Sequence, residues 1–267
     1  MPYKKFYIIT IILLLSVIFV IYLLRGDSKT VGTNVLETVL GTNNNVYDLV
    51  TFNDFDSYIK DQPGTYSYYI KSDFSSLQYN GDYVFYAASL FKVPVAVATV
   101  KYLEQNDISQ EQQDYIKRQL TYLLKDSNND SQQYLIDLVG LSNVKNAFSG
   151  LGLNSNGEYY LNNRASSREI VTLFENLQTT NYISKKNREY IIDLMYQTSF
   201  DDRISVHLKP GLNYSHKIGN WPNTGNWHDC GIVTGDEHLI ICLMSKGVTL
   251  DQFMTVSKAF AEYINTL

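Results

Sequence analysis

Residues 86–98 read YAASLFKVPVAVA, and this stretch decides the interpretation of the chain because a serine and a lysine precede an apolar run. In a helix, positions i and i+3 lie on one face, so Ser89 and Lys92 should have their polar heads within reach of each other. A serine hydroxyl becomes a strong nucleophile when a base takes its proton, and a lysine acts as that base when burial lowers its pKa. The run from Val93 to Ala98 predicts a buried helix that supplies such burial.

The S-x-x-K spacing is not specific by itself, since it also occurs at residues 57–60 and 142–145. Two motifs further along the chain distinguish Ser89. Ser127 is the only serine followed two positions later by an asparagine, in the sequence DSNND. A K-x-G motif then follows at Lys217, within SHKIGNW. The other K-x-G in the chain contains a proline, which is a poor fit to a central strand.

The motifs S-x-x-K, S-x-N and K-x-G in this order resemble the active site of class A β-lactamases and the related penicillin-binding proteins. The neighbouring sequences YAASLFK, DSNNDSQQYLIDLVG and HDCGIV add to the likeness, which covers residues 46–267. The resemblance implies that Ser89 attacks an amide carbonyl to form an acyl-enzyme, with Lys92 as the base. It also implies that Ser127 passes a proton to the leaving nitrogen and that Asn129 hydrogen-bonds the substrate amide.

The lysine motif completes the implied site. Lys217 would supply positive charge that attracts a substrate carboxylate, and Gly219 would let the substrate approach closely. The backbone amides of Ser89 and Asn220 would form the oxyanion hole. Plainer interpretations stand beside these roles: a strand lysine is usually solvated, and the polar DSNND stretch, with Ser127 or Asn129 as N-cap, would also cap a following helix.

The sequence departs from the family pattern in two places. Ile218 stands where the family usually has threonine or serine, whose hydroxyl helps to hold the substrate carboxylate, so Thr224 or Asn220 would have to compensate. Glu158 begins an E-x-x-x-N pattern that resembles the glutamate loop used for deacylation in class A enzymes. The next predicted helix starts near Ser166, which makes this loop much shorter than in those enzymes, and a chance match is the competing interpretation.

Composition and the amino-terminal sequence indicate where the protein acts. The net charge of −5 and the absence of a basic block argue against nucleic-acid binding. Residues 6–24 are uncharged and long enough to cross a bilayer core of about 30 Å. Two lysines precede them, so we expect a single-pass anchor in residues 1–25 with the rest of the chain outside the cytoplasm. A cleavable signal peptide is the rival interpretation. Residues 26–45 read as a polar tether.

The pattern of the remaining chain predicts an α+β fold in which both ends form an antiparallel sheet and a helical lobe is inserted between them. We expect strands at residues 65–72, 75–80, 212–218, 226–233 and 238–244, and helices at residues 52–60, 111–124, 130–139, 166–178, 183–196 and 249–267.

Two further residue types bear on the chemistry. Cys230 and Cys242 fit neither a disulfide framework nor a zinc set, and we expect two buried free thiols on adjacent strands. A disulfide between them is the alternative and depends on the loop length, because a one-residue shift would put the two side chains on opposite faces. The histidines at positions 207, 228 and 238 lack metal-binding spacing, and His216 should point away from the face that presents Lys217. No metal or organic cofactor is expected.

The sequence therefore predicts a membrane-anchored, monomeric serine hydrolase that acts on a β-lactam or a cell-wall-type amide such as a peptidoglycan peptide. Two alternatives stay open. One is a D-alanyl-D-alanine carboxypeptidase or penicillin-binding protein that deacylates slowly, and the other is a non-catalytic module that binds peptidoglycan or a partner protein.

Overall fold

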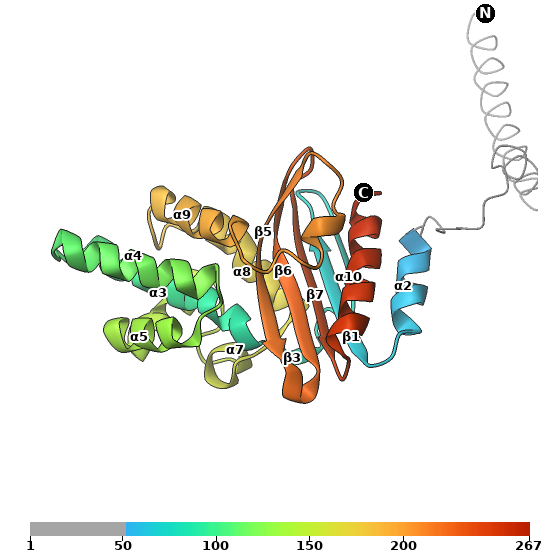
Figure 1. Cartoon of the computed structure of the whole chain (residues 1–267), viewed down its shortest axis with the longest axis horizontal. Helices are drawn as coiled ribbons and strands as arrows, with labels where there is room; N and C mark the ends of the chain where they lie inside the picture. The colour runs from blue at the N-terminus through green and yellow to red at the C-terminus, as the bar shows by residue number, and fades with distance from the viewer. Residues whose placement is uncertain (1–51) are drawn as a thin grey trace, which may run out of the picture. The chain divides into compact units, whose positions relative to one another are not determined.

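A computed structural model describes residues 52–267 of the chain (Figure 1). The predicted anchor and tether lie outside these residues, and so does the beginning of the predicted 46–267 domain. Within residues 52–267 no helix is long and apolar enough to span a bilayer.

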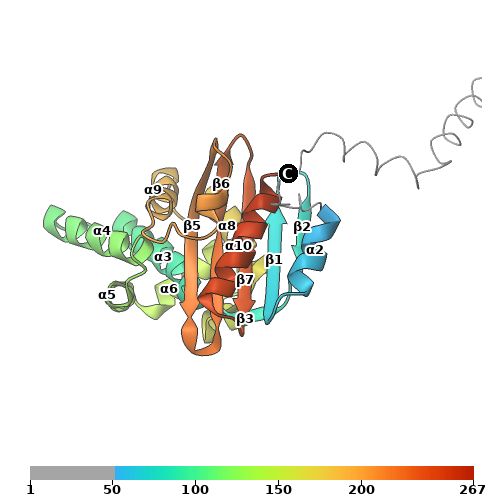
Figure 2. The ribbon, with the colours of Figure 1, turned by 45° about the vertical axis from the view of Figure 1, so that its right-hand side comes forward.

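An antiparallel sheet of five strands, in the order β2-β1-β7-β6-β5, occupies the middle of the domain (Figure 2). Strands from opposite ends of the chain meet in its centre, because β1 pairs with β7 and Ser67 lies opposite Met244. This confirms the prediction that both ends of the domain build the sheet. The strands are β1 (Thr65–Lys71), β2 (Ser76–Tyr79), β5 (Leu212–Trp221), β6 (Asn226–Gly235) and β7 (Leu239–Lys246), with a separate pair β3 (Val84–Tyr86) and β4 (Arg164–Ser166).

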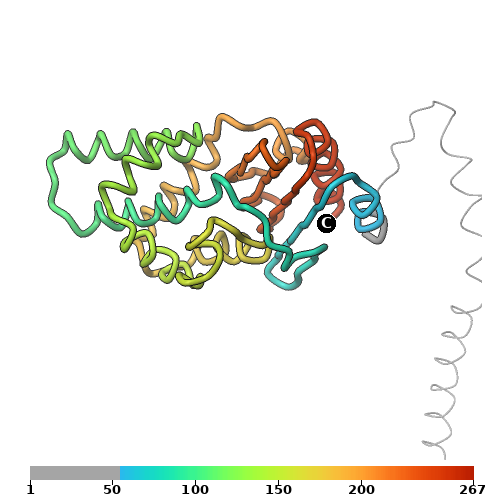
Figure 3. The backbone as a smooth tube through the Cα atoms, turned by 90° about the horizontal axis from the view of Figure 1, so that it is seen from below, coloured from blue at the N-terminus to red at the C-terminus, as the bar shows by residue number. Residues whose placement is uncertain are grey.

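Helices cover both faces of the sheet. On one face α10 and α2 pack through a cluster that includes Phe55, Tyr68 and Phe260, whereas α8 and the helical lobe cover the other face. Figure 3 shows the lobe helices extending away from the sheet. The helices are α2 (Phe52–Lys60), α3 (Lys92–Gln105), α4 (Gln110–Leu124), α5 (Asn129–Val139), α6 (Leu141–Gly150), α7 (Glu158–Asn162), α8 (Ser167–Thr179), α9 (Lys185–Tyr196) and α10 (Leu250–Ile264), with short 3₁₀ turns η1 (Ala88–Phe91), η2 (Ser205–His207) and η3 (Pro222–Thr224).

Local sequence explains where the long helices begin. Capping boxes start α4, α8 and α10, in which Ser109, Ser166 and Thr249 each accept a hydrogen bond from the backbone three residues later. The predicted helices therefore appear within a few residues of their expected bounds. α6, α7 and the short strands β3 and β4 were not predicted, because these elements are brief or lack a clear apolar period.

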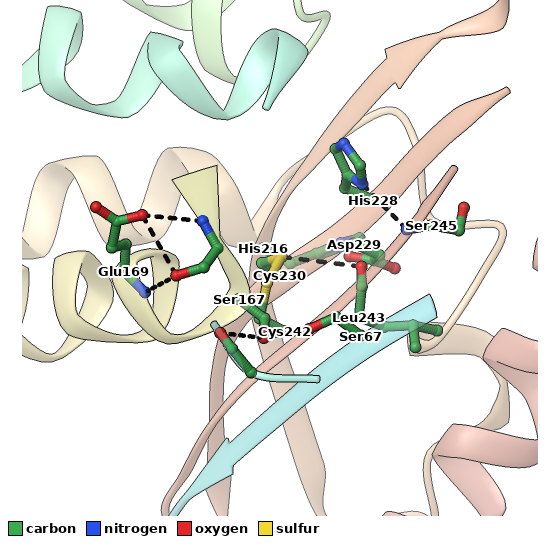
Figure 4. Close-up of a disulfide and its surroundings, with 12 residues drawn as sticks. Ser67, Ser167, Glu169, His216, His228, Asp229, Cys230, Cys242, Leu243 and Ser245 are labelled. Atoms are coloured by element: carbon green, nitrogen blue, oxygen red, sulfur yellow. Dashed lines mark hydrogen bonds and ion pairs between the residues drawn. A yellow bond between two sulfur atoms is a disulfide. The ribbon is translucent and has the colours of Figure 1, made fainter. Parts of the chain in front are cut away.

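The two cysteines form a disulfide, so the expectation of free thiols was wrong (Figure 4). Cys230 on β6 lies directly opposite Cys242 on β7, so both side chains leave the same face of the sheet. Both are fully buried. The register that places Cys230 opposite Cys242 depends on the length of the β6–β7 turn, which could not be predicted from the sequence.

This pairing predicts the outcome of thiol labelling. Protein unfolded in denaturant without a reductant should take up no maleimide, and reduced protein should take up two per chain, because the sequence contains only two cysteines. Intact mass measures the adducts. A Cys242→Ser variant serves as the control and should expose one thiol without reduction. Two adducts on unreduced wild type would contradict the disulfide.

Candidate active site

Ser89 lies in η1, the 3₁₀ turn that leads into α3, and not in the α-helix that the sequence predicted. A 3₁₀ turn has three residues per turn, so Ser89 and Lys92 still project to the same side. Their heads meet, with Lys92 Nζ 2.8 Å from Ser89 Oγ. The preceding residue, Ala88, has a left-handed φ of 51°, which is a strained conformation for a residue with a side chain.

Asn163 holds that strained backbone in place. Its side-chain amide donates to the carbonyl of Ala88 at 3.0 Å, and its own carbonyl accepts from the amide of Ala87 at 2.8 Å. Asn163 itself has a left-handed φ of 51°. Asn163 belongs to none of the predicted motifs, and its only signal in the sequence was that asparagine tolerates left-handed backbone better than most residues.

Lys92 has the surroundings expected of a neutral amine. It is 1% exposed and forms no ion pair with any residue from 52 to 267. Its Nζ donates to Asn129 Oδ1 at 2.7 Å and lies 3.4 Å from Ser127 Oγ. Burial lowers the pKa of Lys92 from its ordinary value to about 8. The neutral form of Lys92, which is able to accept the proton of Ser89, is therefore a minority near pH 7 and becomes the majority above about pH 8.

Ser127 lies in the turn between α4 and α5, with a left-handed φ of 52° that turns its hydroxyl toward both lysines. Lys217 Nζ donates to Ser127 Oγ at 2.8 Å. Asn128, and not Ser127 or Asn129, caps α5 by accepting from the amide of Ser131. Because the capping role belongs to the middle residue, the two outer members of S-x-N are both available to the site.

Lys217 differs from an ordinary solvated strand lysine. Its side chain is fully buried, and it leaves β5 on the face that covers Ser127. Burial lowers the pKa of Lys217 well below its ordinary value, and the charges of Lys92 and Arg203 lower it further. The hydrogen bond to Ser127 is thus its clearest contribution, since it fixes the position of that hydroxyl.

Gly219 allows β5 to approach η1. A Cβ at this position would lie 2.7 Å from the carbonyl oxygen of Ala87 and 2.9 Å from Cδ2 of His228. Any side chain here would push the strand away from the turn that carries Ser89. The structure thus gives Gly219 a packing role in addition to the substrate access predicted from the motif.

A pocket of about 140 Å³ opens beside Ser89. Asn220 lines it next to Gly219, and the rings of Tyr86 and Trp221 contact each other at its rim with centroids 5.3 Å apart. The lining residues are Tyr86, Ala88, Ser89, Asn129, Gln132, Asn163, Asn220 and Trp221. Three motifs that are far apart in the sequence therefore converge on one site. Gln132 is a further member that the sequence analysis did not find.

Glu158 is not brought into this site. Its side chain is exposed at the first residue of α7, where it accepts a hydrogen bond from Asn162 Nδ2 at 3.0 Å. It does not line the pocket that contains Ser89. The E-x-x-x-N pattern thus pairs its own two ends across one helical turn, and the asparagine that reaches the turn carrying Ser89 is the next residue, Asn163.

A buried charge pair lies on the other face of β5. His216 Nδ1 is 2.6 Å from Asp229 Oδ1, and both side chains are fully buried (Figure 4). Asp229 also accepts from the hydroxyl of Tyr214 and, at 3.4 Å, from the amide of Ile204. Burial alone lowers the pKa of His216, but the carboxylates of Asp229 and Asp201 outweigh it and raise this pKa to about 9.

Removing the negative partner should destabilise the domain. We expect Asp229→Asn to lower the free energy of unfolding at pH 6 by about 3 kcal/mol, because a protonated His216 would lose the nearer of its two carboxylate partners and keep only Asp201, at 3.8 Å. The folded-state pKa of His216 lies above its unfolded value, so the pair's contribution is fully present below about pH 6.5 and is lost as the pH rises through about 9.

Urea unfolding at pH 6 and pH 9.5 measures this effect. The difference between wild type and Asp229→Asn should shrink at the higher pH. Asp236→Asn, at an exposed position between β6 and β7, is the matched control and should change stability by less than about 0.5 kcal/mol. An equal loss at both pH values would show that the charge of His216 does not contribute.

No metal site accompanies these residues. Between residues 52 and 267, no group of three or more histidine, cysteine, aspartate or glutamate side chains is placed to hold a metal ion.

Comparisons with known protein families and solved structures agree with the fold described above. The model of a β-lactamase enzyme family, Beta-lactamase2, matches residues 51–118 and 112–264. Among solved structures, PBP-A is 20% identical with a TM-score of 0.67, and the match covers 85% of this chain and 98% of PBP-A. A class A β-lactamase from Bacteroides cellulosilyticus is 17% identical with a TM-score of 0.66, covering 80% of this chain and 97% of that one.

A mutant of PBP-A solved as an acyl-enzyme complex with penicillin G is 21% identical, with a TM-score of 0.65 and coverage of 85% and 100%. At these identities the likeness concerns the fold alone. No curated protein sequence matches the chain.

Proposed function

The chain belongs to the β-lactamase enzyme family, and from this membership and the geometry around Ser89 we propose that it is an acyl-transferring serine hydrolase that cleaves an amide of the cell-wall type. The observation that carries the proposal is the buried amine of Lys92 at 2.8 Å from Ser89 Oγ, without a carboxylate partner in the described domain. A buried lysine without a carboxylate partner contributes little to the stability of the fold, whereas it is well suited to accept a proton from a nucleophile.

In the proposed reaction, Ser89 Oγ attacks the substrate carbonyl carbon while Lys92 Nζ accepts the hydroxyl proton. The carbon–nitrogen bond then breaks, and Ser127 delivers a proton to the leaving nitrogen, drawing on Lys92 at 3.4 Å. Lys217 keeps the Ser127 hydroxyl in position. Water afterwards hydrolyses the ester on Ser89, which releases a carboxylic acid and restores the serine. The amides of Ser89 and Asn220 are the proposed oxyanion hole.

One observation favours a second candidate, in which acylation is followed by slow deacylation. Glu158, the residue predicted to activate water, is exposed and bonded to Asn162, away from the pocket. Intact-mass measurements after exposure to a β-lactam distinguish the two. Steady turnover without a persistent adduct supports a hydrolase, and a stable adduct of one per chain supports a penicillin-binding protein. The absence of both would argue against the β-lactam as a ligand.

The pH dependence of acylation tests the role of Lys92. We expect the rate of labelling by a fluorophosphonate to rise with pH and to level off above about pH 8, because only the neutral amine accepts the Ser89 proton and burial lowers the pKa of Lys92 to about 8. Initial labelling rates between pH 6 and pH 9.5 measure this, corrected for spontaneous hydrolysis of the probe. A rate that is independent of pH over this range would contradict the assignment.

We also propose that the domain acts outside the cytoplasm, held by residues 6–24 in the membrane. Two observations support this placement: the uncharged run preceded by lysines, and the disulfide between Cys230 and Cys242, which is typical of oxidising compartments. Protease treatment of intact cells that express the full chain tests it. The domain should be digested without lysis, and protection of the domain would overturn the proposal.

A further inference from the structure

The outer end of the helical lobe contains a cavity of about 480 Å³, more than three times the volume of the pocket beside Ser89. Figure 1 shows the helices around it, α3, α4 and α5, projecting away from the sheet. The two cavities share no lining residue, and a volume of this size is typical of small-molecule sites. We call it the lobe cavity, and its walls include Tyr102, Ile108, Tyr115, Ile116, Tyr134 and Leu138.

Three tyrosines with unused hydroxyl groups line the lobe cavity, one from each helix: Tyr102, Tyr115 and Tyr134. The rings of Tyr115 and Tyr134 meet edge to face, with centroids 5.3 Å apart. Within residues 52–267, none of the three hydroxyls forms a hydrogen bond to the protein. Burial raises the pKa of Tyr134, and the nearby phenols of Tyr115 and Tyr102 raise it further. A phenol can both donate and accept a hydrogen bond, so the cavity offers a group of such sites to a ligand.

Aliphatic side chains form the floor of the lobe cavity. Ile116 is 3% exposed, and Ile108 and Leu138 are partly buried against the core of the lobe. Tyr102 and Tyr134 also pack against this core, so the walls are held in place before a ligand binds. The cavity thus combines an apolar floor with hydroxyl groups that have no partner in the described domain.

One carboxamide and two opposite charges add to this lining. Gln112 Oε1 accepts from the backbone amide of Ser109 at 3.3 Å, whereas its Nε2 group has no hydrogen-bond partner among residues 52–267. Glu111 and Arg118 lie two turns apart on α4, about 10 Å along the helix axis, and neither forms an ion pair in the described part of the chain. The lining therefore offers a free amide donor and carries no net charge.

The charges around the lobe cavity favour an uncharged ligand. Arg118 lies over the ring of Tyr115, with its guanidinium carbon 5.5 Å from the ring centroid, so a ligand cation would meet another cation there. A phosphate or sulfate would need several basic groups, and the lining contains only one. The charged residues next in sequence to the lining are of both signs: Lys101, Asp107, Asp114, Lys117 and Asp137.

We propose that the lobe cavity binds an N-acetylated sugar. The ring hydroxyls of a sugar exchange hydrogen bonds with phenols, and its C–H face packs against an aromatic ring. The acetamido group adds a carbonyl oxygen that accepts from Gln112 Nε2 and a methyl group that packs on the floor at Ile116. An acyl chain would instead cover the three hydroxyls and leave them without partners. The site is separate from Ser89, so this inference does not depend on the proposed function.

Titration calorimetry of the full chain with a trimer of N-acetylglucosamine tests the proposal. We expect saturable binding at millimolar or lower concentrations, at least about fivefold tighter than binding of the matching glucose trimer, which lacks the acetamido groups. Absence of binding at these concentrations would overturn the inference, and so would equal affinity for the two trimers. Binding of choline in place of the sugar would identify the tyrosines as a cation site and would also overturn it.

Two exposed tyrosines on α4 provide a matched pair of variants. Tyr115 and Tyr122 are 42% and 46% exposed, and of these two only Tyr115 lines the lobe cavity. Tyr115→Ala should weaken sugar binding by at least about tenfold, because a ring contact and a hydroxyl are lost, whereas Tyr122→Ala should bind as wild type. Tyr134→Phe keeps the ring and should weaken binding about fivefold, the size of one hydrogen bond.

Thermal unfolding of the same samples checks that each variant is folded. If Tyr115→Ala and Tyr134→Phe are folded and bind the sugar as tightly as wild type, the sugar binds elsewhere on the protein, and the assignment of the lobe cavity is overturned.

Discussion

Ser89→Ala is expected to abolish covalent labelling by a fluorophosphonate and to reduce amide or thioester cleavage by about 10⁴-fold or more, because the attacking oxygen is removed. The fold should survive. Ser89 is half-buried, and its hydroxyl contacts only Lys92 among the described residues, so the free energy of unfolding should change by less than about 1 kcal/mol. Intact mass after labelling and thermal unfolding of the same samples measure both effects.

Ser142→Ala is the matched control. Ser142 begins another S-x-x-K sequence, but it is exposed near the start of α6 and does not line the pocket beside Ser89. It should label at the wild-type rate. If Ser89→Ala labels as fast as wild type, Ser89 is not the nucleophile, and the chain would instead be a binding module that uses the same pocket without chemistry.

Lys92→Met should slow acylation by about 10³-fold, within the range that general-base catalysis contributes. Methionine fills a similar volume without an amine, so Ser89 keeps its place but loses its proton acceptor. Because Lys92 is 1% exposed and lacks a counter-ion among the described residues, removing its charge should leave the protein as stable as before or more so. Labelling kinetics and urea unfolding test the two statements together.

The residual rate of Lys92→Met should also lose the dependence on a group with a pKa of about 8. Lys145→Met, at the lysine of the S-x-x-K sequence in residues 142–145, is the control and should behave as wild type. If Lys92→Met acylates within about threefold of wild type, another group must take the Ser89 proton, and the buried amine would be reduced to a packing role.

Much of this arrangement was predictable because it depends on local patterns. The apolar spacing of α4 and α8 and the strand-forming runs of β5 to β7 predicted the order of elements, and the order of three short motifs singled out Ser89 as the candidate nucleophile. The direction of Lys217 followed from strand alternation, since His216 contacts Asp229 on the opposite face. Such features can be predicted from residue types and from the spacing of residues along the chain.

The features that the sequence did not reveal depend on geometry that residue types and their spacing do not set. The left-handed backbone at Ala88 is held by Asn163, a residue outside every motif. The disulfide needs Cys230 directly opposite Cys242, which a one-residue change in register would prevent. Glu158 matched a pattern by its spacing, but the short helix α7 directs it to Asn162. The first two depend on contacts between different elements, whereas Glu158 is held by a local contact within its own helix.

The pairing of β1 with β7 has a consequence for biosynthesis. The central strand pair joins the earliest part of the domain to nearly its last, so the sheet closes only after almost the entire polypeptide has been made and, if the proposed location is right, exported. Contacts this distant along a chain form slowly, and until then β1 offers an open edge. Premature termination before β7 should therefore yield an aggregation-prone or degraded product and not a shortened enzyme.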